Sequence, residues 1–465
     1  MKIFVRFQVA LLSFAAFGCQ DNSTTEDFPK ASLGPLGGSI TVQDVTRHAF
    51  SREAPGLTID ESRAFFRGKA LFRDDWVIAP ASAASRDGLG PVFNARNCET
   101  CHVRDGRGRP PEQDQGRFET MLVRISMPNA TPESGPVAVP NYGTQIQNLS
   151  IPGVKSEAQP RVSYEIIKRQ YPDGQGYELT RPIYSFEKLA FGSFPDGMQT
   201  SPRVAPSMIG LGLLEAISEE DILAKADPDD LDGDGISGRA NNVWDQVAGR
   251  KSLGRFGWKA NQPHLKQQTA GAFLGDIGIT SSLFPDNNCA ENQENCHLAI
   301  TGGLPELLDV ILDDVAMYSQ TLAVPAQRHQ DDPAVVRGFQ VFQEVQCAAC
   351  HTVSHQASDT AAAETLKGET FHPFTDLLLH DMGPELADNR EDFLANGQEW
   401  RTPPLWGVGL QGTVNGHTRF MHDGRARNLE EAILWHGGEA ETSRQQFKEL
   451  PSQRRSDLLR FLESL

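Results

Sequence analysis

The sequence predicts a mainly α-helical fold made of two similar units, and three repeated features support this. The pattern C-x-x-C-H occurs twice, at residues 98–102 and 347–351. A short helical pattern precedes each copy, at residues 65–72 and 336–345. An Arg-x-x-Pro segment with a Gly-rich apolar stretch follows later in each half, at 203–213 and 401–410. Repetition in a fixed order indicates a duplicated module.

Each C-x-x-C-H pattern is the attachment motif of a c-type haem. Two thiols add to the vinyl groups at one edge of the porphyrin, and the two-residue gap spaces them for it. The adjacent imidazole, His102 or His351, then reaches the iron as proximal ligand. A thioredoxin-like pair needs no adjacent His, and a zinc site needs more ligands. We therefore expect two covalently bound haems, attached through Cys98, Cys101, Cys347 and Cys350.

The resulting fold class is mainly α, with two cytochrome c-like haem domains. The first is enlarged by irregular and short β insertions, because residues 106–200 are rich in Pro, Gly and Gln with short β-type runs such as 118–125. The expected organisation is a signal peptide at 1–18, a flexible tether at 19–45, a first haem domain at 46–322 and a second at 323–465.

The N-terminal residues predict export. Lys2 and Arg6 precede an apolar run at 7–17 that is too short to span a bilayer. The small residues before Cys19 resemble a lipobox, in which the Cys becomes the lipidated first residue; ordinary signal-peptidase cleavage is the alternative. We expect a periplasmic protein, with a lipid anchor at Cys19 if the lipobox is used.

Two further patterns concern cysteine and calcium. Six residues separate Cys289 from Cys296, too many for haem attachment, so an oxidising compartment favours a disulfide over a pair of redox-active thiols. The segment 230–235 matches the D-x-D-x-D-G start of a calcium loop, with Asp230, Asp232 and Asp234 as ligands. Asn241 replaces the final Glu of an EF-hand, so Asp227 or Asp229 would have to substitute, and a solvated acidic turn is the alternative.

Segments spread over most of the mature chain carry a family resemblance: 86–91, 97–108, 210–217, 227–239, 254–260, 276–280, 377–383, 401–410 and 420–440. In these segments the sequence resembles the exported di-haem oxidoreductases of the peroxidase class, also labelled thiol oxidoreductases. They are distantly similar to bacterial di-haem cytochrome c peroxidases and to the di-haem enzyme that matures methylamine dehydrogenase. The resemblance implies two helical haem domains meeting at an interface, with one haem accepting electrons and the other reacting with hydrogen peroxide.

The resemblance also implies a sixth ligand for the second haem. Related enzymes place a distal ligand about 14 residues after the His of a His-Asp-Gly motif. Counting from His422 leads to His436, at the end of a helical pattern over 429–435. We expect bis-histidine ligation by His351 and His436, with Met421 and Met382 as rival ligands. A surface position for His436 is the alternative.

No sixth ligand is evident for the first haem, which suggests an open face. The repeat makes Glu215 a candidate distal acid that would move a proton between the peroxide oxygens, with Gln145 and Gln147 as weaker candidates and a solvent-facing Glu215 as the alternative. Related enzymes place a Trp between the haems. Trp258 is therefore a candidate relay, or else an ordinary core residue.

The formal net charge of −18 argues against nucleic acid as a partner and is compatible with docking a basic redox protein. The leading hypothesis is a peroxidase-like enzyme that reduces hydrogen peroxide at the first haem with electrons entering through the second. The main alternative is an electron-transfer protein in which both haems are six-coordinate. A partner for a membrane redox or metal-uptake system, without a substrate of its own, is the third.

Overall fold

The computed structural model describes residues 33–83, 86–112, 116–131 and 133–465. The expected signal peptide and Cys19 lie outside these residues. The predicted mainly α class is wrong, because the chain is only 28% helical and has 20% strand in many small sheets. Much of the strand lies between residues 121 and 204, where alternating side chains form long antiparallel strands in place of irregular insertions.

Each half of the molecule is built on a crossed pair of helices. In the first half (residues 46–322), α1 (Ile59–Arg73) packs on α6 (Asp309–Gln320), and in the second half (323–465), α7 (Pro333–Glu344) packs on α11 (Ser452–Ser464). Both crossings need a glycine. A Cβ on Gly68 or on Gly338 would lie 2.0 Å from a carbonyl oxygen of the partner helix.

The same salt bridge fixes both crossings. Arg67 donates through Nε and Nη2 to the two carboxylate oxygens of Asp314, at 2.7 and 2.6 Å. Arg337 does the same to Asp457, at 2.8 and 3.0 Å. The two halves therefore share one helical scaffold.

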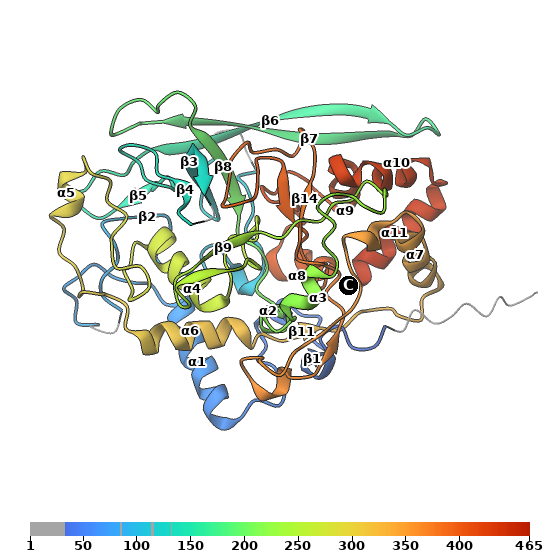
Figure 1. Cartoon of the computed structure of the whole chain (residues 1–465), viewed down its shortest axis with the longest axis horizontal. Coiled ribbons are helices and arrows are strands. Elements are labelled where there is room, and N and C mark those ends of the chain that lie inside the picture. Colours follow the sequence, from blue (N-terminus) through green and yellow to red (C-terminus); the bar gives the residue numbers. More distant parts are fainter. Residues whose placement is uncertain (1–32, 84–85, 113–115, 132) are drawn as a thin grey trace, which may run out of the picture.

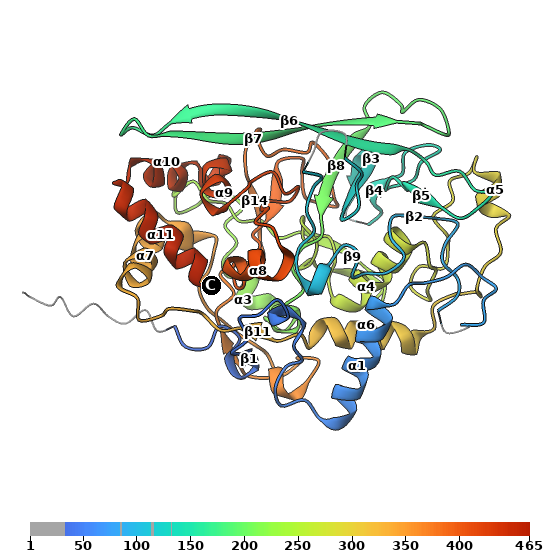
Figure 2. The ribbon, with the colours of Figure 1, turned by 180° about the vertical axis from the view of Figure 1, so that it is seen from behind.

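The strands are concentrated in the first half. β3 (Met121–Thr131) pairs with β4 (Gly135–Val137) and β8 (Gln199–Val204), and β6 (Gln159–Gln170) pairs with β7 (Gly176–Glu187) along its whole length. The β6–β7 hairpin runs across one side of the molecule, from β3 and β8 to α9 and α10 of the second half (Figures 1 and 2).

The hairpin makes specific contacts with the second half. The Tyr171 hydroxyl donates to Glu430 at 2.7 Å, and the Thr180 amide donates to Glu431 at 2.5 Å, both on α9 (Leu429–Trp435). Arg455 of α11 pairs with Asp173 at the hairpin turn, at 2.6 Å. An insertion of one half thus covers a helix of the other.

The remaining helices are short. They are α2 (Leu211–Glu215), α3 (Glu219–Leu223), α4 (Leu265–Ala272) with the π-helical turn η4 (Phe273–Ile277), α5 (Glu294–His297), α8 (Gln411–Asn415) and α10 (Glu441–Glu449). The remaining strands are β1 (Thr41–Val42), β2 (Val92–Phe93), β5 (Leu149–Ser150), β9 (Asn242–Asp245), β10 (Arg250–Leu253), β11 (Val324–Pro325), β12 (His355–Gln356), β13 (Thr370–Phe371), β14 (Leu379–Asp381) and β15 (Glu399–Arg401). None of the helices in the described part of the chain has the length and apolar character needed to cross a bilayer.

The largest buried cluster belongs to both halves. It joins Leu213 and Phe256 of the first half to Phe342 and Trp406 of the second. The described residues before 46 also contribute to it through Ile40, and β1 pairs with β11 in parallel. Burial of this shared apolar surface holds the halves together.

Candidate haem sites

Two cavities lie beside the two C-x-x-C-H motifs. The first cavity is lined by Cys98, Cys101 and His102. The second is lined by residues 347, 350 and 351 of the other motif. Each cavity thus brings together the two thiols and the imidazole that would hold a haem. All four motif thiols are free of disulfides and available for attachment.

The two proximal histidines are held in the same way. Nδ1 of His102 lies 2.8 Å from the Pro206 carbonyl, and Nδ1 of His351 lies 2.8 Å from the Phe374 carbonyl. These bonds leave Nε2 of each ring for a metal. Burial lowers the pKa of both imidazoles to about 4, so both are neutral at pH 7 and can bind iron.

A further pair of corresponding segments contributes to the cavity walls, one in each half, with an offset of 164 residues in the sequence. Phe256 donates its amide to the Gln262 carbonyl at 3.0 Å, and Phe420 donates to the Ala426 carbonyl at 2.8 Å. A helix follows each turn, and a side chain caps its N-terminus: His264 caps α4 and Asn428 caps α9. The matching turn and cap establish which residues correspond.

His436 follows directly after α9 and lines the second cavity. Its Nδ1 lies 2.7 Å from the Ala432 carbonyl, which leaves Nε2 for the cavity. His351 lines the same cavity. The rival ligands Met382 and Met421 line the same cavity. Ligation by His436 therefore stays a prediction, now with a side chain in a suitable place.

The residue that corresponds to His436 in the first cavity is Ala272, which cannot bind a metal. One turn further along, Asp276 of η4 also lines this cavity. It accepts a hydrogen bond from Gln145 at 2.9 Å, and burial raises the pKa of its carboxyl against the opposing charge of Arg124. The sequence patterns did not single out Asp276, because the 164-residue offset from His436 leads to Ala272 and not to the aspartate one turn later.

The other proposed distal groups lie outside the lining of the first cavity. Glu215 accepts hydrogen bonds from the Leu265 amide and from Gln320, both at 2.6 Å, and so stabilises the start of α4. Gln145 and Gln147 donate to the Gly275 carbonyl, behind the cavity wall. Asp276 thus lines the first cavity, whereas these three side chains do not, and the role of Glu215 as a distal acid stays a prediction.

Trp258 lies in the wall between the cavities and lines both of them. Its indole nitrogen donates to the Val204 carbonyl at 2.8 Å, and only 6% of the residue is exposed. Arg107 and Arg401 share this position and also line both cavities. The relay role of Trp258 stays a prediction that this location favours.

The candidate calcium loop brings three carboxylates together. Oxygens of Asp227, Asp230 and Asp232 lie within 4.8 Å of one another. Asp234 instead accepts a hydrogen bond from the Ile236 amide at 2.8 Å. If a cation binds here, Asp227 replaces Asp234 of the predicted set of ligands.

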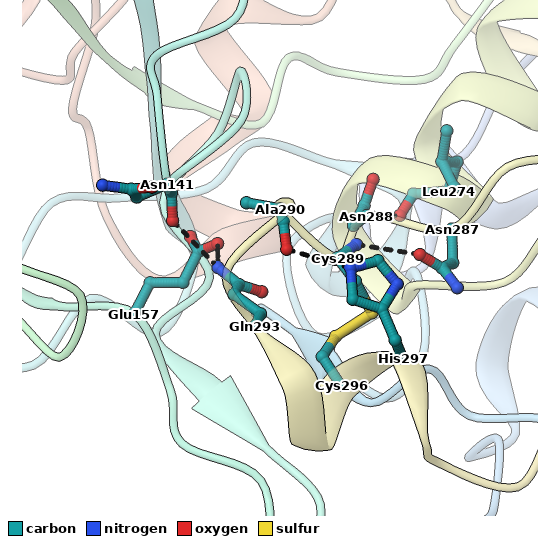
Figure 3. Close-up of a disulfide and its surroundings, with 10 residues drawn as sticks. All are labelled: Asn141, Glu157, Leu274, Asn287, Asn288, Cys289, Ala290, Gln293, Cys296 and His297. Atoms are coloured by element: carbon teal, nitrogen blue, oxygen red, sulfur yellow. Dashed lines mark hydrogen bonds between the residues drawn. A yellow bond between two sulfur atoms is a disulfide. The ribbon is translucent and has the colours of Figure 1, made fainter.

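The expected disulfide joins Cys289 to Cys296 (Figure 3). Its loop supports the region behind the first cavity. Asn288 donates to the Leu274 carbonyl of η4, and Gln293 donates to the buried carboxylate of Glu157 at 2.8 Å. The disulfide thereby fixes the loop that holds the turn carrying Asp276.

Two cavities, each lined by a C-x-x-C-H motif whose histidine is bonded to a backbone carbonyl, indicate a two-haem redox protein of duplicated architecture. The model of the family described as "Di-haem oxidoreductase, putative peroxidase" matches residues 32–465, and the chain belongs to this family. No curated protein matches the chain.

Proposed function

We propose that the protein is a periplasmic di-haem c-type peroxidase that reduces hydrogen peroxide, or a related oxidant, at the first haem. The single observation that carries this proposal is the difference between Ala272 and His436 at corresponding positions of the two cavities. An open iron binds and cleaves peroxide, whereas a six-coordinate iron only transfers electrons.

In the first cavity His102 would bind the iron, and Cys98 and Cys101 would attach the haem through thioether bonds. Asp276, which lines this cavity, would accept a proton from the incoming peroxide and return it to the oxygen that leaves as water. Its raised pKa brings the carboxyl closer to neutral pH, where a group can both accept and donate a proton. The overall reaction consumes one peroxide, two electrons and two protons and yields two waters.

Electrons enter through the second haem in this proposal, from a small redox protein. His351 and His436 would hold that iron from both sides, which lowers its potential relative to Met ligation. Trp258 would carry electrons across the wall between the cavities. The proposal also includes a calcium ion at Asp227, Asp230 and Asp232, which a melting curve measured with and without a chelator tests. It further includes lipidation of Cys19, which incorporation of a radiolabelled lipid tests.

Low-temperature EPR of the oxidised and of the one-electron-reduced protein tests the main point. We expect a high-spin ferric signal from the first haem in at least one of the two forms. Low-spin signals throughout would favour the alternative, an electron-transfer protein with two capped irons.

Peroxide turnover tests whether Asp276 is the distal acid. Asp276→Asn should lower the rate by ~10²–10⁴-fold without changing the EPR of the resting protein. Glu215→Gln is the matched control, because this carboxylate bonds the start of α4 and does not line the cavity, and it should keep near wild-type turnover. The reverse ranking of the two variants would restore Glu215 as the distal acid.

A further inference from the structure

Two buried guanidinium groups in the wall between the cavities have no carboxylate partner among the described residues. Arg107 donates through Nη2 to the Met421 carbonyl at 2.6 Å, and its buried Nε has no hydrogen-bond partner. Arg401 donates to the carbonyls of Gly257 and Thr402, at 2.9 and 3.0 Å. Neither forms a salt bridge within the described part of the chain.

The arginines that line a single cavity are mixed in this respect. Arg203 lines the first cavity and pairs with Asp392 at 3.2 Å, and Arg444 lines the second and pairs with Glu441. Arg124 lines the first cavity and forms no salt bridge within the described residues, but the charge of the nearby Asp276 acts on it. Arg107 and Arg401 are set apart by lining both cavities, as does Trp258, whose ring centroid lies 5.1 Å from the Arg107 guanidinium carbon.

A buried cation without a counter-ion is costly, and its pKa falls in response. Burial lowers the pKa of Arg107 to about 10 with no carboxylate opposing it, and it lowers that of Arg401 to about 10 against the distant charge of Asp376. Each haem brings two propionate carboxylates. A planar guanidinium binds a carboxylate with two parallel hydrogen bonds, so the missing partner and the unpaired donor match chemically.

We propose that Arg107 and Arg401 bind haem propionates in the wall between the cavities and that Arg107, through its contact with both cavities, sets the reduction potentials of the two haems together. Reduction adds a negative charge to a haem, so a nearby fixed cation favours the reduced form. Arg107 is thus a positioning residue that couples the haems electrostatically beside Trp258. The inference rests on haem occupying both cavities, but not on peroxide turnover.

Redox titration of the holoprotein, followed by haem absorption, tests this proposal. In Arg107→Gln the reduction equilibrium constants of both haems should fall at least ~tenfold, which corresponds to ~59 mV for a one-electron step. Arg104→Gln is the matched control. It removes the same charge from a residue that bonds the Val414 carbonyl and lines neither cavity, and its potentials should stay close to wild type.

Unchanged potentials in Arg107→Gln, or a shift confined to one haem, overturn the proposal. Haem content, measured on each sample, separates this failure from failure of the cofactor assignment. If Arg107→Gln does not take up haem, Arg107→Lys decides, because it keeps the charge. Potentials near wild type support the electrostatic role, and a tenfold fall in Arg107→Lys overturns it.

Discussion

The two halves of the molecule share a scaffold and differ at the position on which the proposed function depends. Both cross two helices at a glycine, bond their proximal histidine to a backbone carbonyl and place a capped helix on the far side of a cavity. The helix of the second half ends at His436, whereas the first has Ala272 there and continues into η4 with Asp276. In the proposed function, this loss of one side chain and gain of another gives the two haems different roles.

The largest effect is expected when His436, the proposed sixth ligand of the second haem, is replaced. His436→Ala should convert the second haem from low-spin to high-spin, because it removes the imidazole whose Nδ1 is bonded to the Ala432 carbonyl and whose Nε2 is left for the iron. EPR and absorption spectra measure this change. Met421→Leu and Met382→Leu are the controls, and loss of the low-spin signal in either control instead would transfer the ligand role to that Met.

The converse substitution sharpens the comparison. Ala272→His places an imidazole in the first cavity where His436 lies in the second, and it should give a low-spin first haem. Peroxide turnover should then fall to the background rate, since the iron no longer has an open face. Ala272→Leu controls for bulk without a ligating atom. A high-spin first haem in Ala272→His would contradict the correspondence of the two helices.

The halves also differ in how they hold a buried glutamate. Glu431 of the second half pairs with Arg427 at 2.7 Å, but Glu157 of the first half has only neutral donors, and burial raises its pKa to about 8 from 4.5. Between these pH values the folded chain keeps a proton that the unfolded chain releases, so stability falls as pH rises.

Glu157→Gln should remove that slope. At ~1.4 kcal/mol per pKa unit, the wild type should lose about 4 kcal/mol more than the variant between pH 4.5 and 8. Urea unfolding across this range measures the difference. Glu165→Gln, at an exposed position of β6, should behave as wild type. Parallel pH curves for wild type and Glu157→Gln would show that Glu157 is ionised in the folded protein.

The smallest effect is expected for the Arg–Asp salt bridge that both halves share. Arg67→Ala and Arg337→Ala should each cost about 1 kcal/mol, because both salt bridges are bidentate but their arginines are half-exposed. Urea unfolding of the two variants should give values within about 0.5 kcal/mol of each other. A much larger loss in one half would mean that the scaffolds are not energetically equivalent.

Local patterns made part of the site predictable. The thiols and proximal histidines lie within five residues, so their chemistry is visible in the sequence, and the spacing after His422 pointed to His436 in a cavity wall. Asp276 and Arg107 acquire their positions only through tertiary packing. Ala272 gives no signal of its own in the sequence, since the informative feature at this position is a missing ligand.

The fold class was predicted wrongly. The duplicated helices were visible as a pattern before each motif, but the long β6–β7 pairing was not, because the Pro, Gly and Gln content of residues 106–200 indicated irregular structure. Glu215 shows a related limit. The repeat placed it near the cavity, whereas its carboxylate is used to bond the start of α4.

The β6–β7 hairpin belongs to the first half by sequence and to the second by contact. Through Tyr171 and Thr180 it supplies partners to the acidic side chains of α9, and Asp173 pairs with α11. A gene fragment encoding residues 323–465 alone would leave those partners behind. Recombination between members of the family would therefore have to transfer the insertion and the C-terminal half together, so the hairpin and the surface of α9 should be inherited as one unit.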